Sequence, residues 1–299
     1  IIVTGRSLPR RVCGAALSMA NDGLSSGAMS HAVLRTQGLS KRYVRGPRWR
    51  NCESFVALSE VELEIASGGT LALVGSSGSG KSTAARCIAQ LEKPDSGQIW
   101  IDGTELTRLS ARELLPFRSR VQMIFQDAAT AMNPRFSAAE VIQEPLRIQG
   151  RNRSEQWDIA ETLMKEVALS RDWLKRSVIE FSGGQRQRLA IARALAVLPR
   201  LLILDEALSG LDLSIQAQIA NLLLDLQAAH SLTYLLISHD LALVVGLADR
   251  ISVMSKGRIV ESGAISTILR DPSHDETKKL LSAAREANSK LAASIGASV

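Results

Sequence analysis

The chain has 299 residues, of which 45% are hydrophobic and 4% aromatic, and its 36 Lys and Arg against 30 Asp and Glu give a formal net charge of +6. No apolar run reaches about 18 residues, so no membrane-spanning helix is predicted. The scattered Cys13, Cys52 and Cys87 lack the spacing of metal ligands or of a disulfide framework, which favours a reducing cytosol. The Lys and Arg residues form no basic block of the kind that indicates nucleic-acid binding, and contact of a basic face with anionic lipid explains the net charge at least as well.

Residues 1–32 are rich in Ser, Gly and Arg and show no hydrophobic periodicity, which predicts a disordered N-terminal extension. The apolar stretch from Val12 to Ala20 is too short and too weakly hydrophobic for a signal peptide. Met29 stands just before the first predicted strand, and we expect the native chain to start there.

Residues 33–105 are predicted to form a mostly antiparallel β region that also holds a phosphate-binding loop. The apolar run 70–74 predicts a buried parallel strand, and the residues after it fit the pattern G-x-x-x-x-G-K-[ST]. Glycines in this pattern let backbone N–H groups point inward, and a helix from Lys81 to about Gln90 directs its positive end at the anion. We expect Lys81 to reach the β- and γ-phosphates and Ser82 to bind Mg²⁺. The predicted loop comprises Gly75, Ser76, Ser77, Gly78, Ser79, Gly80, Lys81, Ser82 and Thr83.

Residues 110–180 are predicted to be mainly helical, with the clearest helices at 140–148 and 155–169. A short strand, 121–125, precedes Gln126, which carries no functional signal by itself. Further on, a Ser and two glycines precede a predicted helix from Arg186 to about Val197. Such a helix start binds anions, although alone it is equally an N-cap with flexible glycines.

Residues 181–262 alternate between helix and strand, which predicts a parallel sheet. One apolar strand ends in Asp205-Glu206 and another ends just before His239, where α/β sheets bind ligands. We expect Asp205 to hold Mg²⁺, directly or through water, and Glu206 to orient or deprotonate the attacking water. In isolation, acidic pairs and histidines at strand ends are more often structural. The segment 276–295 predicts a charged, Ala-rich helical tail.

The phosphate loop, followed by Phe181-Ser182-Gly183-Gly184-Gln185, resembles the ATP-binding subunit of an ABC transporter over roughly residues 33–270. This resemblance implies an ATP hydrolase of the α/β class with the P-loop NTPase fold and with ATP and Mg²⁺ as ligands. It further implies a RecA-like parallel-sheet core, an antiparallel β subdomain and a helical subdomain at about 127–195. Residues 271–299 would form a C-terminal helical tail outside this domain.

The same resemblance gives roles to single residues along the chain. His239 would contact the γ-phosphate and hold Glu206, while Gln126 would sense Mg²⁺ and water just before a segment that faces the membrane partner. Tyr43 would stack on the adenine ring, the alternative being a tyrosine that packs on the small sheet.

A shared site between two subunits is also implied, because one chain cannot easily direct two anion-binding helix ends at one γ-phosphate. In a head-to-tail dimer, each ATP is held between the phosphate loop of one subunit and the signature of the other. The signature residues are Ser182, Gly183, Gly184 and Gln185, and Asp212 would cross the same interface.

Within the family the chain is most similar to the ATPases of oligopeptide, dipeptide and nickel importers. The supporting segments are 125–127, 132–135, 144–147, 182–188, 214–218 and 238–241. His274-Asp-Glu-Thr277 departs from the His-Pro-Tyr-Thr of the peptide group, and no Cys follows Cys87, which excludes an iron–sulfur cluster in the tail and keeps nickel open. Ala207-Leu208 replaces the usual Pro-Thr, which should leave hydrolysis intact.

We therefore expect an ATPase that powers uptake of a peptide-like solute, at the cytoplasmic face of the bacterial plasma membrane. Its expected partners are membrane permease subunits, a second identical or homologous ATPase subunit and, indirectly, a periplasmic or lipid-anchored solute-binding protein, with no nucleic acid. Nickel or opine import is an alternative within the subfamily. From other classes, a non-transport ABC ATPase acting on nucleic acid or ribosomes and a small-molecule kinase are the alternatives.

Overall fold

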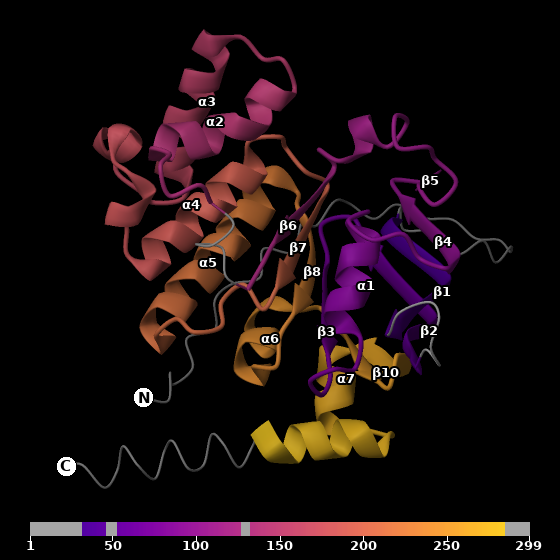
Figure 1. Cartoon of the computed structure of the whole chain (residues 1–299). Helices are drawn as coiled ribbons and strands as arrows, with labels where there is room; N and C mark the ends of the chain where they lie inside the picture. The colour runs from indigo at the N-terminus through magenta and orange to yellow at the C-terminus, as the bar shows by residue number, and fades with distance from the viewer. Residues whose placement is uncertain (1–31, 46–52, 127–131, 285–299) are drawn as a thin grey trace, which may run out of the picture.

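The computed structural model describes residues 32–45, 53–126 and 132–284. It contains two β-sheets and a set of helices, which confirms the α/β class (Figure 1). The expected N-terminal extension lies almost wholly outside the described residues, and the first strand begins at Ala32, the last residue of that predicted extension.

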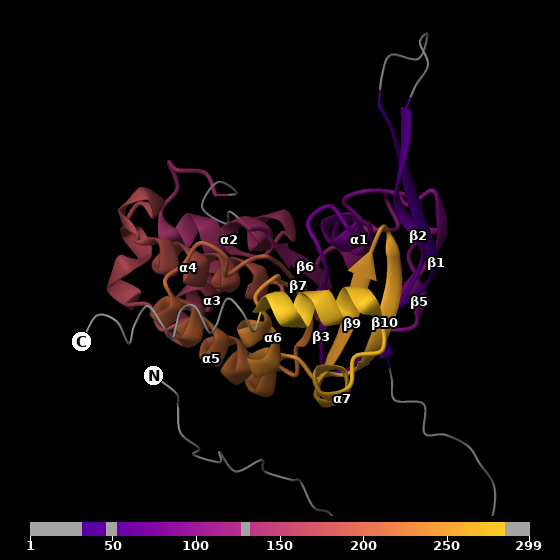
Figure 2. The same ribbon diagram turned by 90° about the horizontal axis from the view of Figure 1, so that it is seen from below.

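The smaller sheet is antiparallel, with the strand order β2-β1-β4-β5. Its first two strands are long and form a hairpin that projects from the rest of the domain (Figure 2). The strands are β1 (Ala32–Arg45), β2 (Glu53–Ala66), β4 (Ser96–Ile101) and β5 (Thr104–Glu105). This sheet is the antiparallel β region expected in residues 33–105.

The larger sheet has six strands in the order β10-β9-β3-β8-β7-β6. All neighbouring pairs are parallel except β9 and β10, which are antiparallel. The strands β3, β7 and β8 are buried at every position, which explains their continuous apolar sequences. The bounds are β3 (Thr70–Val74), β6 (Val121–Ile124), β7 (Leu201–Asp205), β8 (Thr233–Ile237), β9 (Arg250–Ser255) and β10 (Arg258–Ala264).

Alternate side chains of these parallel strands enter two different hydrophobic clusters. Leu71 and Leu73 join the cluster that holds α1 (Lys81–Ile88) and the small sheet, whereas Ala72 and Val74 join the one that holds the other helices. Helix α1 therefore lies between the two sheets, and the helices α4 (Gly183–Leu195), α5 (Leu213–His230) and α6 (Leu241–Leu247) cover the opposite face (Figure 1).

The region between β6 and β7 is helical. It contains α2 (Ala138–Ile148) and α3 (Arg153–Glu166), which contain or overlap the two clearest predicted segments, and the short 3-10 helices η2 (Arg171–Lys175) and η3 (Val178–Glu180). Another short helix, η1 (Leu115–Phe117), precedes β6. Reciprocal hydrogen bonds between Ser137 and Glu140 fix the start of α2.

Several predicted helix bounds differ from the observed ones by two or three residues. Helix α4 begins at Gly183 rather than Arg186, because Ser182 and Gln185 form a capping box that takes both glycines into the first turn. Helix α1 ends at Ile88, two residues before the predicted end.

At the C-terminal end, α7 (Ile265–Arg270) is followed by a helix over residues 275–284 that runs beside α6 and β10 (Figures 1 and 2). The rest of the predicted tail helix lies outside the described residues. None of the helices in the described part of the chain has the length and apolar content required to cross a membrane.

Candidate nucleotide site

The loop between β3 and α1 is closely packed on its neighbours. Gly75 has φ +151° and Gly80 has φ +109°, both in the region that side chains rarely adopt. A Cβ at Gly75 would lie 2.1 Å from the Met254 carbonyl oxygen, and one at Gly80 would lie 2.3 Å from the Ala57 carbonyl oxygen. These glycines are required by close backbone contacts as well as by the turn itself.

Lys81 holds its ammonium group inside this loop. Its Nζ donates hydrogen bonds of 2.9 Å to the carbonyl oxygens of both Gly75 and Ser76. Burial lowers the pKa of Lys81 below its ordinary value of 10.5, although the carboxylates of Glu206 and Asp205 oppose this change. The loop thus encloses a positive charge at the helix start, which is the arrangement that a polyphosphate requires.

Ser82 and Asp205 lie side by side at the edge of the larger sheet where the parallel strands have their carboxyl ends. The Ser82 hydroxyl donates a 3.0 Å hydrogen bond to Asp205 Oδ1. Burial raises the pKa of the Asp205 carboxyl above its ordinary 3.8, against the effect of this hydrogen bond. Hydroxyl and carboxylate oxygens are suitable ligands for Mg²⁺, which commonly takes only one or two carboxylates and leaves other positions to phosphate and water. Among the described residues there is no group of three or more His, Cys, Asp or Glu side chains that could hold a metal ion.

Glu206 and His239 form a pair at the ends of neighbouring strands. His239 Nδ1 is 3.6 Å from Glu206 Oε1, and the His239 side chain is 66% exposed. Glu206 has a positive φ of 48°, which is uncommon for a non-glycine residue and occurs often at functional sites. The Ser209 hydroxyl, 2.7 Å from the Glu206 carbonyl oxygen, holds the turn that follows.

Gln126 reaches the same sheet edge through strand pairing. Ile124 at the end of β6 is paired with Leu204 in β7, so the residues that follow each strand leave the sheet together. Gln126 is exposed and stands two positions beyond this pair. The segment after it, residues 127–131, lies outside the described residues.

The structure does not bring the signature residues to the phosphate loop of the same chain. Ser182 and Gln185 bond to each other at the start of α4, through a 2.9 Å bond from the Ser182 amide and a 3.4 Å bond to the Ser182 hydroxyl. A Cβ at Gly184 would lie 2.6 Å from Ile215 in α5, so this position needs a glycine where the two helices meet. Helices α1 and α4 lie on opposite faces of the sheet, and Ser182 at the start of α4 is exposed to solvent.

Neither Asp212 nor Tyr43, both in the described part of the chain, makes a hydrogen bond with a residue of the phosphate loop. Asp212 is exposed at the start of α5, three positions after Ser209 in the chain. Tyr43 is half-buried on β1, and its hydroxyl hydrogen-bonds to Glu92 rather than to any phosphate-loop residue.

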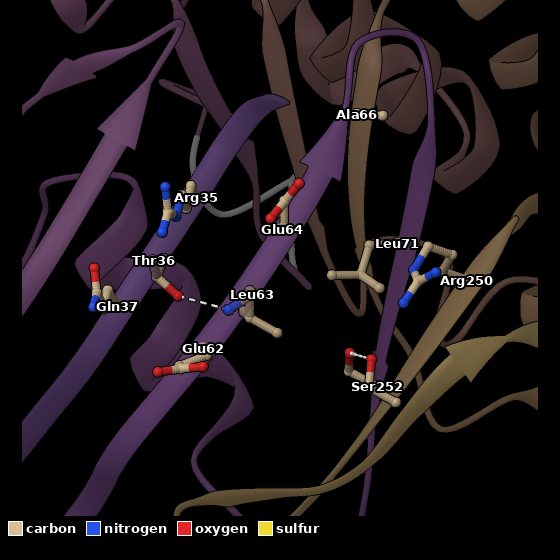
Figure 3. Close-up of a pocket in the computed structure, with 11 residues that line it drawn as sticks. Arg35, Thr36, Gln37, Glu62, Leu63, Glu64, Ala66, Leu71, Arg250 and Ser252 are labelled. Atoms are coloured by element: carbon tan, nitrogen blue, oxygen red, sulfur yellow. Dashed lines mark hydrogen bonds between the residues drawn. The ribbon is translucent and has the colours of Figure 1, made fainter. Parts of the chain in front are cut away.

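A separate cleft of about 530 Å³ opens between the edge strand β2 and the strands β3, β9 and β10 (Figure 3). Arg35, Glu62, Glu64 and Arg250 lie along it, and the hydroxyl of Thr36, which also lines it, accepts a 2.9 Å hydrogen bond from the Leu63 amide. Leu71, which also lines it, is near the start of β3, whereas the phosphate loop follows the end of that strand. This cleft is therefore not part of the nucleotide site.

The family model described as ABC transporter matches residues 58–209, a range that includes the phosphate loop, the signature and the Asp205-Glu206 pair. The chain belongs to the ABC transporter family. As an ABC ATPase it is an ATP hydrolase, and the predicted family and fold are confirmed.

Several curated relatives of this ABC ATPase are named for peptide import. A probable peptide ABC transporter ATP-binding protein of Sinorhizobium fredii is 42% identical over 86% of this chain and 73% of its own length. A putative peptide import ATP-binding protein of Brucella ovis is 43% identical over 84% of this chain and 78% of its own. The oligopeptide transport ATP-binding protein OppF of Streptococcus mutans is 44% identical over 77% and 75%.

Among solved structures, the ATP-binding cassette MJ0796 in a dimeric post-hydrolysis state, bound to ADP and Pi, has the same fold. The TM-score is 0.69 at 28% sequence identity, and the match covers 78% of this ABC ATPase and 98% of that chain. A second dimeric structure of the same cassette matches equally well, with a TM-score of 0.69 at 29% identity.

Sequence reasoning did not identify two residues that contact the predicted site. Glu92 accepts the Tyr43 hydroxyl hydrogen bond, and Arg86 forms a 2.6 Å ion pair with Glu92. One signal was available, since Arg86 follows Ser82 by four positions and so shares its face of α1. Glu92 belongs to no motif, and only the packing of β1 against the end of α1 identifies it.

Proposed function

We propose that this ABC ATPase binds ATP and Mg²⁺ and powers import of a peptide-like solute through a separate membrane permease. The observation that carries this proposal is the gathering of Lys81, Ser82, Asp205 and Glu206 at one edge of the sheet. Peptide as the solute class rests on the names of the relatives and on the sequence segments shared with peptide importers.

Binding would begin at the phosphate loop. On arrival of ATP, the Lys81 ammonium exchanges the two carbonyl contacts it makes now for phosphate oxygens, which are stronger partners because they are charged. The Ser79 hydroxyl is buried without a hydrogen-bond partner among the described residues, so the loop also has an unused polar group. Both features fit a site for a polyphosphate.

Ser82 and Asp205 would hold Mg²⁺, with Gln126 close to the same edge. When bound, the ion would neutralise charge on the phosphates and so favour transfer of the terminal phosphoryl group to water. The raised pKa of Asp205 describes the carboxyl without a cation, and a cation beside it would favour the ionised form.

Glu206 would act on the attacking water. It accepts a proton from, or orients, the water that attacks the terminal phosphate, and His239 at 3.6 Å limits the positions its carboxylate can take. A base held in one position loses less entropy when the reaction geometry forms.

The complete site requires a second ATPase subunit, identical or homologous. Ser182 through Gln185 of that subunit would supply the amide groups that face the terminal phosphate, and Asp212 would lie at the same interface. The exposed start of α4 supports this arrangement, because an anion-binding helix end stands free in one chain. Closure around ATP and reopening after hydrolysis would then drive the permease.

The permease would hold the protein at the cytoplasmic face of the plasma membrane, and a solute-binding protein would act through that permease.

The proposal is tested in two stages. Purified protein should hydrolyse ATP in the presence of Mg²⁺, and Lys81→Ala should lose most nucleotide binding, measured by calorimetry, while its melting temperature without nucleotide stays close to that of wild type. Uptake of labelled di- to pentapeptides by cells with the complete transporter should then depend on Lys81. ATP hydrolysis without peptide uptake would overturn the solute class, and no ATP binding would overturn the whole proposal.

A further inference from the structure

Three side chains form a continuous contact between β1 and the end of α1. The Tyr43 hydroxyl on β1 donates a hydrogen bond to Glu92 Oε2. The other carboxylate oxygen of Glu92 is 2.6 Å from Nε of Arg86. None of the three belongs to the phosphate loop or the signature, and Tyr43 is the only one of them for which a role was expected.

Strand pairing brings Tyr43 close to the phosphate loop. The β2 residues Ala57 and Leu58 lie against Gly80, since a Cβ there would be 2.3 Å from the Ala57 carbonyl oxygen and 3.2 Å from Leu58 Cδ2. In the hairpin, Leu58 is paired with Lys41 and Phe55 with Tyr43. These pairs are separated by two positions on β1 and by three on β2, where the register shifts, which corresponds to roughly 7 to 10 Å. Tyr43 is thus within a nucleotide's length of the loop.

The orientation of the Tyr43 ring is restricted from more than one direction. Lys41 Nζ lies 5.8 Å from the ring centroid, at one face of the ring. Lys41 is itself fixed by the Lys93 carbonyl oxygen at 2.7 Å and by Asp95 Oδ1 at 3.3 Å. With Glu92 at the hydroxyl, Tyr43 is held at its tip and on one face, yet it is only partly buried.

Arg86 connects this contact to the phosphate-binding helix. It is four residues after Ser82 in α1, so both side chains leave the same face of the helix. The guanidinium is the charged partner of Glu92, and its Nε makes an ion pair without hydrogen-bond geometry, so its attraction for the carboxylate is what keeps Glu92 beside the tyrosine. Arg86 and Glu92 therefore fix the position of the Tyr43 ring relative to α1, the helix that begins with Lys81.

We propose that Glu92 and Arg86 are positioning residues that fix the Tyr43 ring so that its open face stacks on the base of ATP. The inference rests on the proposed nucleotide site and adds residues to it. A ring already held in place binds the base without the cost of ordering a free side chain, so the contact contributes to nucleotide affinity and not to the chemical step. It follows that KM for ATP depends on Glu92 whereas kcat does not.

The test compares ATP with inorganic tripolyphosphate, which can fill the phosphate loop but has no base. Glu92→Ala should raise KM for ATP about 3- to 10-fold with kcat within about 2-fold of wild type. Tyr43→Phe, which keeps the ring and loses only the hydroxyl, should have the same effect, and the double variant should be no worse than either single one. The inhibition constant of tripolyphosphate should be unchanged in all three variants.

Two further variants separate positioning from a general loss of structure. Glu92→Gln keeps an oxygen acceptor for Tyr43 and should restore part of the lost affinity. Glu105→Gln is the matched control, because it removes one carboxylate and its ion pair with Arg108 at 3.1 Å on β5, in the small sheet that carries Tyr43. Its KM should equal that of wild type.

The inference is overturned if both Glu92→Ala and Tyr43→Phe retain the wild-type KM, or if affinity for tripolyphosphate falls in parallel with that for ATP. Should Glu92→Ala fail to fold, Tyr43→Phe alone decides the question. Neither result would affect the proposed function, because loss of ATP and tripolyphosphate binding in Lys81→Ala tests that separately.

Discussion

The Ser82 hydroxyl and the Asp205 carboxylate, 123 residues apart in the chain, are joined by a 3.0 Å hydrogen bond between the start of α1 and the end of β7. This bond brings two oxygen ligands of the kind that Mg²⁺ prefers next to the phosphate loop. It is made possible by the sheet order, which separates β3 from β7 by a single strand, β8.

Ser82→Ala should weaken the use of Mg²⁺ more than the binding of ATP. The variant keeps Lys81 and the loop but removes one expected metal ligand, so we expect at least about a 10-fold increase in the Mg²⁺ concentration needed for half-maximal hydrolysis. Steady-state ATPase assays over a Mg²⁺ series measure this. An unchanged Mg²⁺ requirement would remove Ser82 from the metal site.

Glu206→Gln should almost abolish turnover while ATP binding persists. Glutamine has nearly the same shape but is not a base, and we expect a loss of at least about 100-fold in kcat. The variant should accumulate as an ATP-stabilised dimer, visible by size-exclusion chromatography with light scattering. His239→Ala is the companion variant, since it leaves the carboxylate and removes only its neighbour at 3.6 Å. Turnover near wild type in Glu206→Gln would exclude Glu206 as the base.

Much of this site could be predicted because each residue follows a recognisable strand. Lys81 comes after an apolar run with a loop of fixed spacing, and Asp205 and His239 each come after other buried strands. The start of α4 was misplaced, since glycines usually weaken helices and the capping box that keeps them in the first turn depends on side-chain geometry.

The contact of Glu92 with Tyr43 could not be predicted at all. It joins residues 49 positions apart, and neither the spacing nor the composition of the chain indicates which side of β1 faces the end of α1. The same applies to the C-terminal segment. Its helix was expected, but its attachment to β10 through Glu261 has no sequence pattern.

Glu261→Gln should loosen the C-terminal helix in a pH-dependent way. Glu261 accepts bonds from the Ser273 amide and hydroxyl, both at 2.8 Å, and from the His274 amide at 3.1 Å. Burial opposes ionisation of Glu261, but its contacts with Thr277, Ser273 and His274 outweigh this and lower its pKa from 4.5 to about 2. The carboxylate therefore stabilises the fold fully above about pH 4.5, and this stabilisation is lost as the pH falls through about 2.

We expect Glu261→Gln to melt about 1 to 4 °C below wild type at pH 7 and this difference to shrink between pH 4.5 and pH 2. Thermal unfolding at pH 7, 4.5 and 3 provides the measurement. Glu62→Gln, which changes an exposed carboxylate on β2, is the control and should melt like wild type. A constant difference at every pH would show that the charge of Glu261 is not what holds the segment.

Ser182→Arg tests the shared site. The long side chain at the start of α4 would fill the space that the terminal phosphate of ATP on the opposite subunit must enter, while the variant's own phosphate loop is unchanged. We therefore expect near-normal ATP binding to the single subunit, no closed dimer and loss of ATPase activity. Equilibrium binding and light scattering, run on one preparation, distinguish these properties.

Mixing Ser182→Arg with Lys81→Ala makes the test sharper. In a mixed dimer one interface carries both defects, because it joins the altered signature of one subunit to the altered loop of the other, and the second interface carries neither. Differently tagged subunits purified in two affinity steps give defined mixed dimers. We expect these to recover up to about half of the wild-type ATPase activity, whereas each variant alone stays inactive, since sites that act independently would each contribute one half. Inactive mixed dimers that still form in ATP would contradict independent shared sites, and full activity of Ser182→Arg alone would place the signature outside the nucleotide site.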